Sequence, residues 1–295
     1  MNLSNPDSNI PKPKVGVVGL GFMGSAITQR LLDAGYPTYV WNRTRDKAES
    51  LNEQGAIWSE SPLVDCSHIV ISLYSSQVVE EVLAPWFDLL TPSHLLIDTT
   101  TGDPEASVGL AKRIQAKGAE YLEAPISGSS EQTRRGEATV IAAGNPTAFQ
   151  ACRELLPVLG KHIFYVGPSG NAAKMKLVSN LVLGLNRAAV AEGLHFAEAL
   201  GIELESALQV LLGSGAYSKQ METKGPKMIR GDYAPQARLA QHLKDVHLML
   251  DSASSVGIEL PLTNAHRELL ERAVSDGFGD LDNSALFASM RKGTT

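Results

Sequence analysis

The order of hydrophobic and polar residues predicts alternating strands and helices in the first half of the chain. Short β-branched runs alternate with stretches of helical periodicity, which is the pattern of a parallel sheet wrapped by helices. The predicted strands are Val15–Val18, Thr38–Trp41, Ile69–Leu73, Leu95–Asp98, Ala119–Glu123, Thr139–Ala142 and Ile163–Val166. The predicted helices are Met23–Ala34, a segment near Arg45–Asn52, and two that begin with a cap and a proline at Asp103-Pro104 and Asn145-Pro146.

The second half of the chain has a helical pattern throughout. Apolar residues occupy most faces of the segment from Asn171 to Leu200, as expected of a helix that is buried on most sides. At about 1.5 Å per residue this helix is about 45 Å long, enough to cross a domain junction. Further helices are predicted at Leu204–Leu212, around Gln236–Val256 and at Leu262–Ser275.

These patterns predict two domains of different fold class. Residues 14–169 are predicted to form a Rossmann-type doubly wound α/β domain. Residues 170–295 are predicted to form an all-α domain for substrate binding and dimerisation, which begins with the long inter-domain helix. Residues 1–13 are polar and contain prolines, so we expect a tail and not a signal peptide.

Composition argues against several classes of function. The 295 residues are 43% hydrophobic and 20% charged, as in a soluble globular protein, and the net charge of −6 without a basic cluster argues against nucleic-acid binding. The apolar runs are too short to span a membrane. Cys66 and Cys152 fit neither a disulfide framework nor a metal motif, and the seven histidines show no metal-binding spacing. We therefore expect a cytoplasmic protein without a metal ion.

A glycine motif lies between the first predicted strand and helix. It consists of Gly19, Leu20, Gly21, Phe22, Met23 and Gly24, in the pattern G-x-G-x-x-G. In a dinucleotide-binding fingerprint the first glycine permits a tight turn, the second lets the backbone approach the pyrophosphate, and the third lets helix and strand pack closely. Glycines also occur in ordinary turns. Here the motif follows a strand and opens a helix, so it predicts a cofactor site.

The end of the second predicted strand indicates which dinucleotide binds. An acidic residue there would accept a hydrogen bond from the ribose 2′-OH and repel a 2′-phosphate. This chain has Asn42, Arg43 and Thr44 instead, which offer a guanidinium and neutral donors to a phosphate. In a simpler interpretation Arg43 is solvated and Thr44 caps the next helix. We predict NADP(H) as the cofactor in preference to NAD(H).

Two further loops follow strand ends at the same predicted edge of the sheet, where open α/β sheets bind ligands. Leu73 and Tyr74 lie in the first loop and Thr101 lies in the second. At this point each loop is either a cofactor contact or an ordinary connection.

Two segments carry candidate catalytic chemistry. The sequence E-A-P-I-S-G-S at 123–129 leaves a strand and enters a loop whose N–H groups suit a carboxylate. Lys176 and Asn180 lie one turn apart near the start of the long helix. A lysine in such an apolar helix is costly unless it faces a cleft or a partner. The spacing is compatible with a catalytic lysine, and equally with one whose amine extends to solvent at the domain seam.

Together, these motifs resemble the β-hydroxyacid dehydrogenase family. Four motifs occur in order: the glycine fingerprint, the E-A-P-I-S-G loop, the helix G-N-A-A-K-M-K-L-V-S-N and the pair Lys244-Asp245. The resemblance covers nearly everything after the N-terminal tail and is nearest to the glyoxylate/succinic semialdehyde reductase branch. Residues 41–44, 127–129 and 279–282 indicate that branch.

The resemblance implies a role for each motif. Lys176 would be the catalytic acid/base, with Asn180 holding the substrate near it. Ser127 and Gly128 would bind the substrate carboxylate, and Asp245 would support the site. The cofactor contacts that the motifs and the resemblance suggest, besides the glycine motif, are Asn42, Arg43, Thr44, Leu73, Tyr74, Thr101 beside the nicotinamide ribose, and Lys244.

One position departs from the pattern of that branch. Seven residues before Lys244, where an aromatic residue is expected, the chain has Ala237, followed by Arg238. Alanine leaves the substrate pocket wider, so Ala237 is a candidate for substrate specificity. Arg238 either pairs with a distal carboxylate of the substrate or faces solvent.

The predicted function is the NADPH-dependent reduction of a small carboxylated aldehyde or ketone to the hydroxy acid. Three alternatives remain: oxidation of a 3-hydroxy acid such as 3-hydroxyisobutyrate, an imine reductase on the same scaffold, and a non-catalytic dinucleotide-binding module. Lys176 argues against an imine reductase, and Lys176 together with Asn180 argues against a non-catalytic module. The apolar character of the long helix and of those that follow predicts a homodimer or homotetramer.

Overall fold

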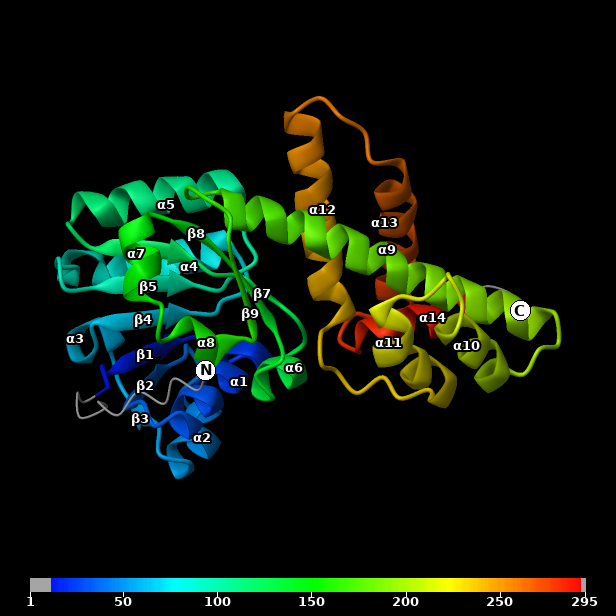
Figure 1. Cartoon of the computed structure of the whole chain (residues 1–295), viewed down its shortest axis with the longest axis horizontal. Helices are drawn as coiled ribbons and strands as arrows, with labels where there is room; N and C mark the ends of the chain where they lie inside the picture. The colour runs from blue at the N-terminus through cyan, green and yellow to red at the C-terminus, as the bar shows by residue number, and fades with distance from the viewer. Residues whose placement is uncertain (1–11, 293–295) are drawn as a thin grey trace, which may run out of the picture. The chain divides into compact units, whose positions relative to one another are not determined.

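Residues 12–292 are described by the computed structural model, which divides between Lys176 and Leu177 into a unit built on a sheet and a helical unit (Figure 1). Most of the predicted N-terminal tail, residues 1–11, therefore lies outside the described residues.

The first unit contains a sheet of nine strands within residues 12–292. They are β1 (Val15–Val18), β2 (Thr38–Trp41), β3 (Ile57–Trp58), β4 (His68–Ile71), β5 (Leu95–Asp98), β6 (Glu120–Glu123), β7 (Ile126–Ser127), β8 (Thr139–Gly144) and β9 (His162–Tyr165). Their order is β3-β2-β1-β4-β5-β6-β8-β7, and β9 pairs with β8. All neighbours from β3 to β6 are parallel, as predicted for a doubly wound sheet.

The sheet departs from a parallel arrangement beyond β6. There β8 runs antiparallel to both β6 and β7. The link from β7 to β8 contains the five-residue helix α6 (Ser130–Arg134), and a parallel crossover needs a longer connection. The sequence pattern identified β8 as a strand but did not indicate its direction.

Alternate residues of the central strands pack into two separate cores. Val70 and Ile97 belong to the core on one face, whereas Ile69 and Leu96 belong to the core on the other. Burial on both faces explains why these strands are apolar throughout. The first face is covered by α1 (Phe22–Asp33), η1 (Arg45–Ala48), α2 (Glu49–Glu53), α7 (Pro146–Ala151) and α8 (Leu156–Leu159). The second is covered by α3 (Pro62–Asp65), α4 (Ser76–Leu83), η2 (Ala84–Leu89) and α5 (Pro104–Ala116).

Two predicted helix starts in the first unit are confirmed by their caps. The Asp103 carboxylate accepts a hydrogen bond from Ala106 N at 2.7 Å at the start of α5, and the Asn145 side chain accepts one from Thr147 N at 3.0 Å at the start of α7. The helix α4 was not predicted. It is only eight residues long, and the Ser75 side chain caps it.

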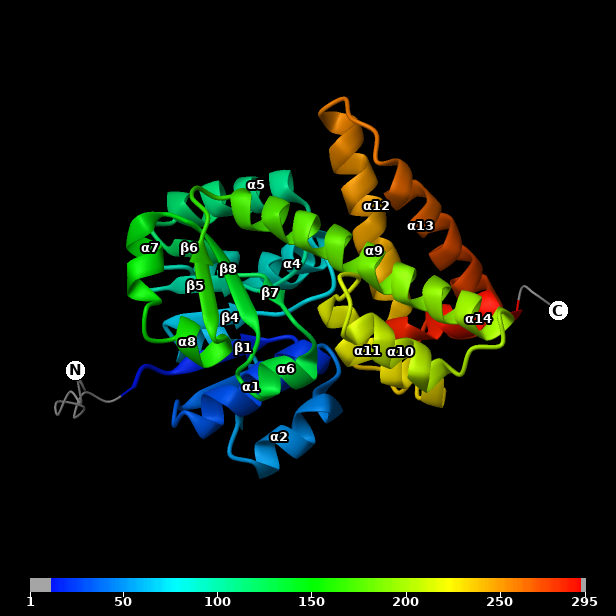
Figure 2. The same cartoon turned by 45° about the vertical axis from the view of Figure 1, so that its right-hand side comes forward.

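The second unit is helical. The long helix α9 (Asn171–Ala199) begins in the first unit and continues into the second. The other helices are α10 (Leu204–Leu212), α11 (Lys219–Arg230), α12 (Leu239–Ser255), α13 (Pro261–Ala273), η3 (Val274–Phe278), η4 (Asn283–Ala285) and α14 (Leu286–Lys292). In both views α12 and α13 lie side by side (Figure 2). No helix within residues 12–292 is long and apolar enough to span a membrane.

Helix α11 was missed because Gly225 and Pro226 interrupt its helical pattern. The structure explains the glycine. A Cβ at position 225 would lie 2.7 Å from Leu208 Cδ1, so a larger residue there would have to displace the buried Leu208 side chain of α10. Packing between helices therefore decided an element that periodicity did not predict.

Candidate active site

The glycine motif forms the loop between β1 and α1. Gly19 has a φ of +99°, and a Cβ at Gly24 would lie 1.8 Å from the Gly19 carbonyl oxygen, so both positions require glycine. At Gly21, by contrast, a Cβ would meet no atom of the described chain within 4 Å. The backbone is therefore open at the position where the fingerprint places the pyrophosphate.

Two neighbouring loops join the glycine loop at the carboxyl end of the sheet. A Cβ at Gly19 would lie 2.3 Å from the carbonyl oxygen of Ser72, which follows β4. Thr99, which follows β5, donates from Oγ1 to Ile71 O at 2.7 Å, and Thr100 Oγ1 accepts from Leu73 N at 3.2 Å. The strand order reverses between β1 and β4, which is where open α/β sheets bind ligands.

The predicted cofactor contacts differ in exposure. Phe22 and Tyr74 are 48% and 52% exposed, as is suitable for side chains that cover a ligand. Leu20 is buried in the core, and Met23 packs against that core. Leu20 and Met23 therefore offer a ligand only their backbone, and the Leu20 N–H is already donated to Asn42 Oδ1 at 3.0 Å. Leu73 and Thr101 are half-buried.

The segment directly after β2, residues 42–44, contains a cation and no acidic residue. Asn42 links the segment to the glycine loop through Leu20 N, and its Nδ2 donates to Thr44 O at 2.9 Å. Thr44 is the cap residue directly before η1, but its side chain makes no capping hydrogen bond within the described residues, which contradicts the capping interpretation. The Arg43 side chain is 70% exposed and lies 3.6 Å from Glu81. Such exposed ion pairs are weak, so the guanidinium is available to a phosphate.

The buried carboxylate of Asp98 supports one of these loops, and the sequence analysis did not single it out. Asp98 ends β5; its Oδ1 accepts from Thr100 N and its Oδ2 from the Tyr121 hydroxyl, both at 2.9 Å. Burial raises the pKa of Asp98, although these hydrogen bonds oppose the shift. This carboxylate fixes the loop that carries Thr101.

A second buried carboxylate, Glu123, holds the start of α9. Its Oε1 accepts from Gly170 N and its Oε2 accepts from Ala173 N, the latter at 3.1 Å. Burial raises the pKa of Glu123 to about 7, against the opposing effect of these N–H donors. A carboxylate is favourable at a helix N-terminus. The E-A-P-I-S-G segment therefore anchors the helix that carries Lys176, a role that the sequence motif alone did not indicate.

The Lys176 side chain is buried and contacts the E-A-P-I-S-G segment. It is 6% exposed, and Nζ donates to the carbonyl oxygen of Ile126 at 2.8 Å. Ile126 and Ser127 form β7, so the structure brings Lys176 beside the half-buried Ser127 and Gly128. The alternative in which the lysine amine extends to solvent is contradicted.

The second unit brings three further predicted residues together. Asn180 on α9 donates from Nδ2 to Asp245 Oδ2 on α12 at 2.9 Å. Lys244 Nζ lies 3.0 Å from Asp245 Oδ1. Asn180 and Asp245 are 8% and 5% exposed, so this is a buried polar cluster. Lys176 and Asn180 lie one turn apart on α9.

Hydrogen bonds hold the backbone at Ala237, the position where the chain departs from the pattern of the branch. Ala237 N donates to Asp282 Oδ2 at 3.3 Å, and its carbonyl accepts from Asn283 N at 2.9 Å. The Arg238 side chain is 53% exposed and lies 3.8 Å from Asp280 Oδ1. Asp282, which the sequence analysis used only as a branch signature, therefore organises the segment that carries Ala237.

Both cysteines are buried and free, and burial raises the pKa of each thiol to about 12. Within residues 12–292, no group of three or more His, Cys, Asp or Glu side chains is placed to hold a metal ion.

Two family models match successive parts of the chain. Residues 14–167 match the NAD-binding domain of 6-phosphogluconate dehydrogenase. Residues 170–290 match the NAD-binding model of NADP-dependent 3-hydroxyisobutyrate dehydrogenase. Glyoxylate/succinic semialdehyde reductase 1 of Arabidopsis thaliana is 33% identical over 94% of this chain and 98% of its own length.

The chain belongs to the β-hydroxyacid dehydrogenase family. The predicted enzyme class, an NAD(P)-dependent oxidoreductase of hydroxy acids, is confirmed, and the predicted NADP(H) cofactor is confirmed at the level of the family. Another relative, cytokine-like nuclear factor N-PAC of Aedes aegypti, is 33% identical over 90% of this chain, which spans about half (48%) of that protein.

Solved structures confirm the predicted fold class. A 3-hydroxyisobutyrate dehydrogenase from Salmonella typhimurium superposes with a TM-score of 0.86 at 26% identity, covering 94% of this chain and 99% of that one. The protein Psf3, solved in complex with NADP+ and 2-OPP, superposes with a TM-score of 0.87 at 26% identity and the same coverage.

Proposed function

We propose that this enzyme reduces a small carboxylated aldehyde or ketone to the hydroxy acid with NADPH, with Lys176 as the proton donor. The observation that carries this proposal is the buried Lys176 amine, held by Ile126 O beside Ser127 and Gly128. An ammonium in that position is suited to stabilise and protonate the alkoxide that develops on a carbonyl oxygen.

The chain's own residues divide the remaining tasks. When bound, NADPH supplies the hydride. Ser127 and Gly128 bind the substrate carboxylate, and Asn180, oriented by Asp245, binds the substrate near the reacting carbon. In the reverse direction, oxidation of a 3-hydroxy acid, Lys176 accepts the proton instead.

The preference for NADPH rests on Arg43. Its exposed guanidinium has only a weak ion pair with Glu81, and residues 42–44 contain no carboxylate to repel a 2′-phosphate. Arg43→Asp should weaken NADPH binding by about 10–100-fold, the effect of losing one charged hydrogen-bonding group, and should narrow the gap to NADH. Equal kcat/KM for NADH and NADPH in the wild-type enzyme would contradict this assignment.

The decisive experiment is a substrate panel with both cofactors. Glyoxylate, succinic semialdehyde, tartronate semialdehyde and 3-hydroxyisobutyrate are each tested for NADPH oxidation or NADP+ reduction. We expect reduction of the acid aldehydes to exceed oxidation of 3-hydroxyisobutyrate. Turnover of a cyclic imine without turnover of any acid would favour the imine reductase alternative, and NADPH binding without any turnover would favour the non-catalytic module.

Oligomer formation is part of the same proposal. One face of α9 exposes Val178, Val182 and Phe196, and Leu200 follows directly after the helix; each of the four is between 53% and 64% exposed. This apolar face supports the predicted homodimer or homotetramer. Light scattering after size exclusion measures the mass, and a monomer at micromolar concentration would contradict it. The functional domains 14–169 and 170–295 and a cytoplasmic location remain predictions.

A further inference from the structure

The helical unit contains a fully buried arginine whose donors lack acceptors. Arg187, on α9, is 0% exposed. Its Nε and Nη2 atoms are buried and have no hydrogen-bond partner among residues 12–292. A buried charge without an acceptor is among the costliest features of a protein interior, and a bound group that supplies the missing acceptor removes that cost.

The two atoms define the shape of that acceptor. Nε–H and Nη2–H lie on one edge of the guanidinium plane and point in parallel. This edge matches the two oxygens of a carboxylate, which it binds through two parallel hydrogen bonds. The unsatisfied donors therefore match a planar anion with two oxygens, and they exclude a cation.

Asp282, the carboxylate whose charge acts on Arg187, is already saturated with hydrogen bonds. Asp282 accepts from Lys224 Nζ at 2.8 and 3.0 Å, one bond to each carboxylate oxygen. It also accepts from the backbone N–H groups of Gln236, Ala237 and Ser284 and from the Ser284 hydroxyl. No lone pair remains for Arg187, although its charge influences Asp282 and Lys224.

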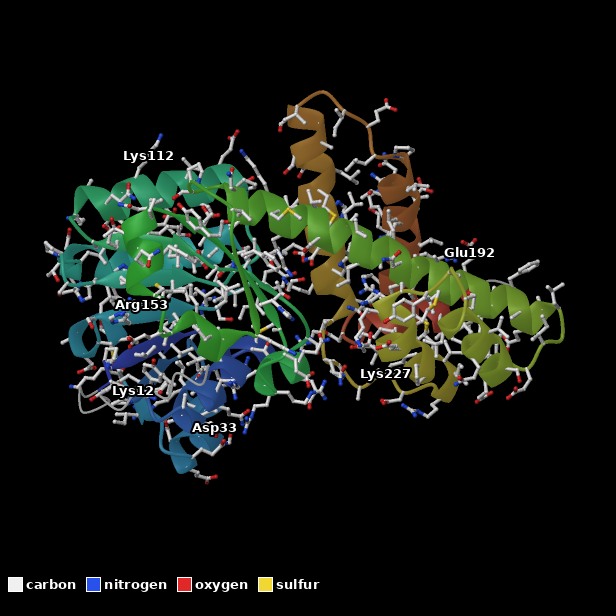
Figure 3. All side chains as sticks on the ribbon, in the orientation of Figure 1. Lys12, Asp33, Lys112, Arg153, Glu192 and Lys227 are labelled. Carbon is white, nitrogen blue, oxygen red and sulfur yellow. The ribbon has the colours of Figure 1, made fainter. Side chains whose placement is uncertain are left out.

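The other charged groups around Arg187 do not compensate it. Lys224 is 6% exposed and Lys227, labelled in Figure 3 on α11, is 7% exposed, so they add positive charge (Figure 3). Lys227 pairs with Asp232 at 3.2 Å, and that carboxylate is half-exposed. His266 is neutral near pH 7, because burial and the charge of Arg187 lower its pKa to about 4. The cluster is therefore a net cation inside the helical unit.

The position of Arg187 relates it to the substrate residues of the same unit. Asn180, Gly184 and Arg187 follow one face of α9, and α12 packs on that face with Asp245 against Asn180 and His242 against Gly184. Arg187 lies about 10 Å along the axis from Asn180, and long helical side chains extend toward the N-terminus, which is the direction of Asn180.

From this geometry we infer that Arg187 binds the carboxylate at the far end of the substrate, so that the enzyme's substrates are acid aldehydes longer than glyoxylate. This inference rests on the proposed function, in which Asn180 holds the reacting end. Ser127 and Gly128 then bind a carboxylate that adjoins the reacting carbon, as in glyoxylate, whereas Arg187 binds the carboxylate of a longer acid aldehyde, which lies at the far end. The inference also agrees with Ala237, where the missing aromatic side chain leaves room for a longer substrate and whose N–H binds Asp282.

The test compares Arg187→Met with Arg272→Met, the matched substitution at an exposed arginine of α13 in the same unit. Arg187→Met should lower kcat/KM for succinic semialdehyde by about 10–100-fold, mainly through KM, because a charged bidentate contact is lost. Glyoxylate should change by less than threefold, since its only carboxylate adjoins the reacting carbon. Arg272→Met should change neither value.

Thermal unfolding gives a readout independent of turnover. Arg187→Met should raise the Tm of the ligand-free protein, because an uncompensated buried charge is replaced by an apolar side chain of similar length. Without cofactor, 4-hydroxybutyrate should raise the Tm of the wild type but not of Arg187→Met. The neutral analogue 1,4-butanediol should affect neither protein.

Three outcomes would overturn the inference. A lower Tm in Arg187→Met, with the substrate ratio unchanged, would make Arg187 a structural residue. A higher Tm together with equal protection of both proteins by 4-hydroxybutyrate would show that buried water, and not a carboxylate, satisfies the guanidinium. An equal loss of kcat/KM for both aldehydes in Arg187→Met would show that Arg187 does not select for the chain length of the substrate. If the wild type reduces no acid aldehyde, the proposed function fails, while Arg187-dependent protection by 4-hydroxybutyrate still supports the carboxylate site.

Discussion

The two units of this enzyme treat their buried charges in opposite ways. The sheet unit satisfies its buried charged groups internally. The carboxylates Asp98 and Glu123, at strand ends, accept hydrogen bonds from backbone N–H groups or a hydroxyl of the same unit, and the Lys176 amine donates to the Ile126 carbonyl. In the helical unit the buried cations Arg187, Lys224 and Lys227 outnumber the one carboxylate, Asp282, that is fully buried beside them. The first arrangement is complete in itself, whereas the second leaves the Arg187 donors for a ligand.

This difference fits the proposed tasks of the two units, which are cofactor binding in the sheet unit and substrate discrimination in the helical unit. A cofactor site is built from backbone that must keep one shape, so satisfied carboxylates that fix loops and helix starts suit it. A substrate site distinguishes among acids, and charged donors that meet an acceptor only when the ligand arrives suit that task.

The largest effect is expected at Lys176, the last residue of the sheet unit. Lys176→Ala should lower kcat by about 10²–10⁴-fold, because proton donation is lost in the transition state. NADPH affinity, measured by fluorescence titration, should stay within a factor of two or three, since that lysine is not needed to dock the cofactor. Lys174→Ala, at an exposed position two residues earlier on the same helix, is the control. Turnover of Lys176→Ala within a few-fold of wild type would refute the assigned role.

A Glu123 variant tests whether this buried carboxylate lowers the stability of the folded protein when it ionises, although its hydrogen bonds are made. Its folded-state pKa of about 7 lies above the usual 4.5, so the folded protein binds this proton more tightly than the unfolded chain does. The stability that this group contributes is therefore full below about pH 4.5 and is lost as the pH rises through 7. Glu123→Gln cannot titrate and lacks this loss.

We therefore expect Glu123→Gln to gain stability relative to wild type as the pH rises from 4.5 to 8, by at most about 3 kcal/mol at about 1.4 kcal/mol per pKa unit. Denaturant unfolding of both proteins at a series of pH values measures the difference, in which all other titrating groups cancel. Parallel curves across that range would show that Glu123 does not titrate there.

Two alanine substitutions in the glycine loop of the sheet unit form a matched pair. Gly24→Ala should destabilise the free protein by about 1–3 kcal/mol, because the new Cβ overlaps the Gly19 carbonyl. Gly21→Ala should leave the free protein as stable as wild type, because that Cβ meets nothing within 4 Å, but should weaken NADPH binding by crowding the pyrophosphate. Tm values and NADPH titrations separate the two effects. Unchanged NADPH affinity in Gly21→Ala would move the pyrophosphate away from this loop.

The smallest effect is expected at Ala237 in the helical unit. The Ala237 N–H donates to Asp282 and its carbonyl accepts from Asn283 N, so the backbone is held and Ala237→Phe should add a ring without moving the segment. One methylene in an apolar pocket changes discrimination by about 1–3 kcal/mol, so the ring should shift preference from succinic semialdehyde toward glyoxylate by about tenfold or more. The ratio of kcat/KM for the two substrates measures this. A wild type that already prefers glyoxylate, or an unchanged ratio, would show that position 237 does not set chain length.

The sequence by itself determined the elements whose physics is local. The strands β1, β2 and β5 and the helix α10 have the predicted bounds, because apolar runs and helical periodicity are decided by neighbours along the chain. The two cap-and-proline starts were predictable for the same reason. The glycine fingerprint could be assigned because three backbone positions with a fixed spacing require the absence of a Cβ.

Tertiary structure decided what depends on partners distant in the sequence. Helix α11 places a glycine against α10, and the direction of β8 follows from the length of its connection. Periodicity did not reveal that Glu123 caps a helix that starts 48 residues later, since only the fold brings strand end and helix start together. Arg187 shows the same limit most clearly. In the sequence it is one polar residue in an apolar helix, and its significance comes from a carboxylate, Asp282, that other groups have already saturated. Hydrogen bonds and charge compensation depend on distances that the order of residues does not contain.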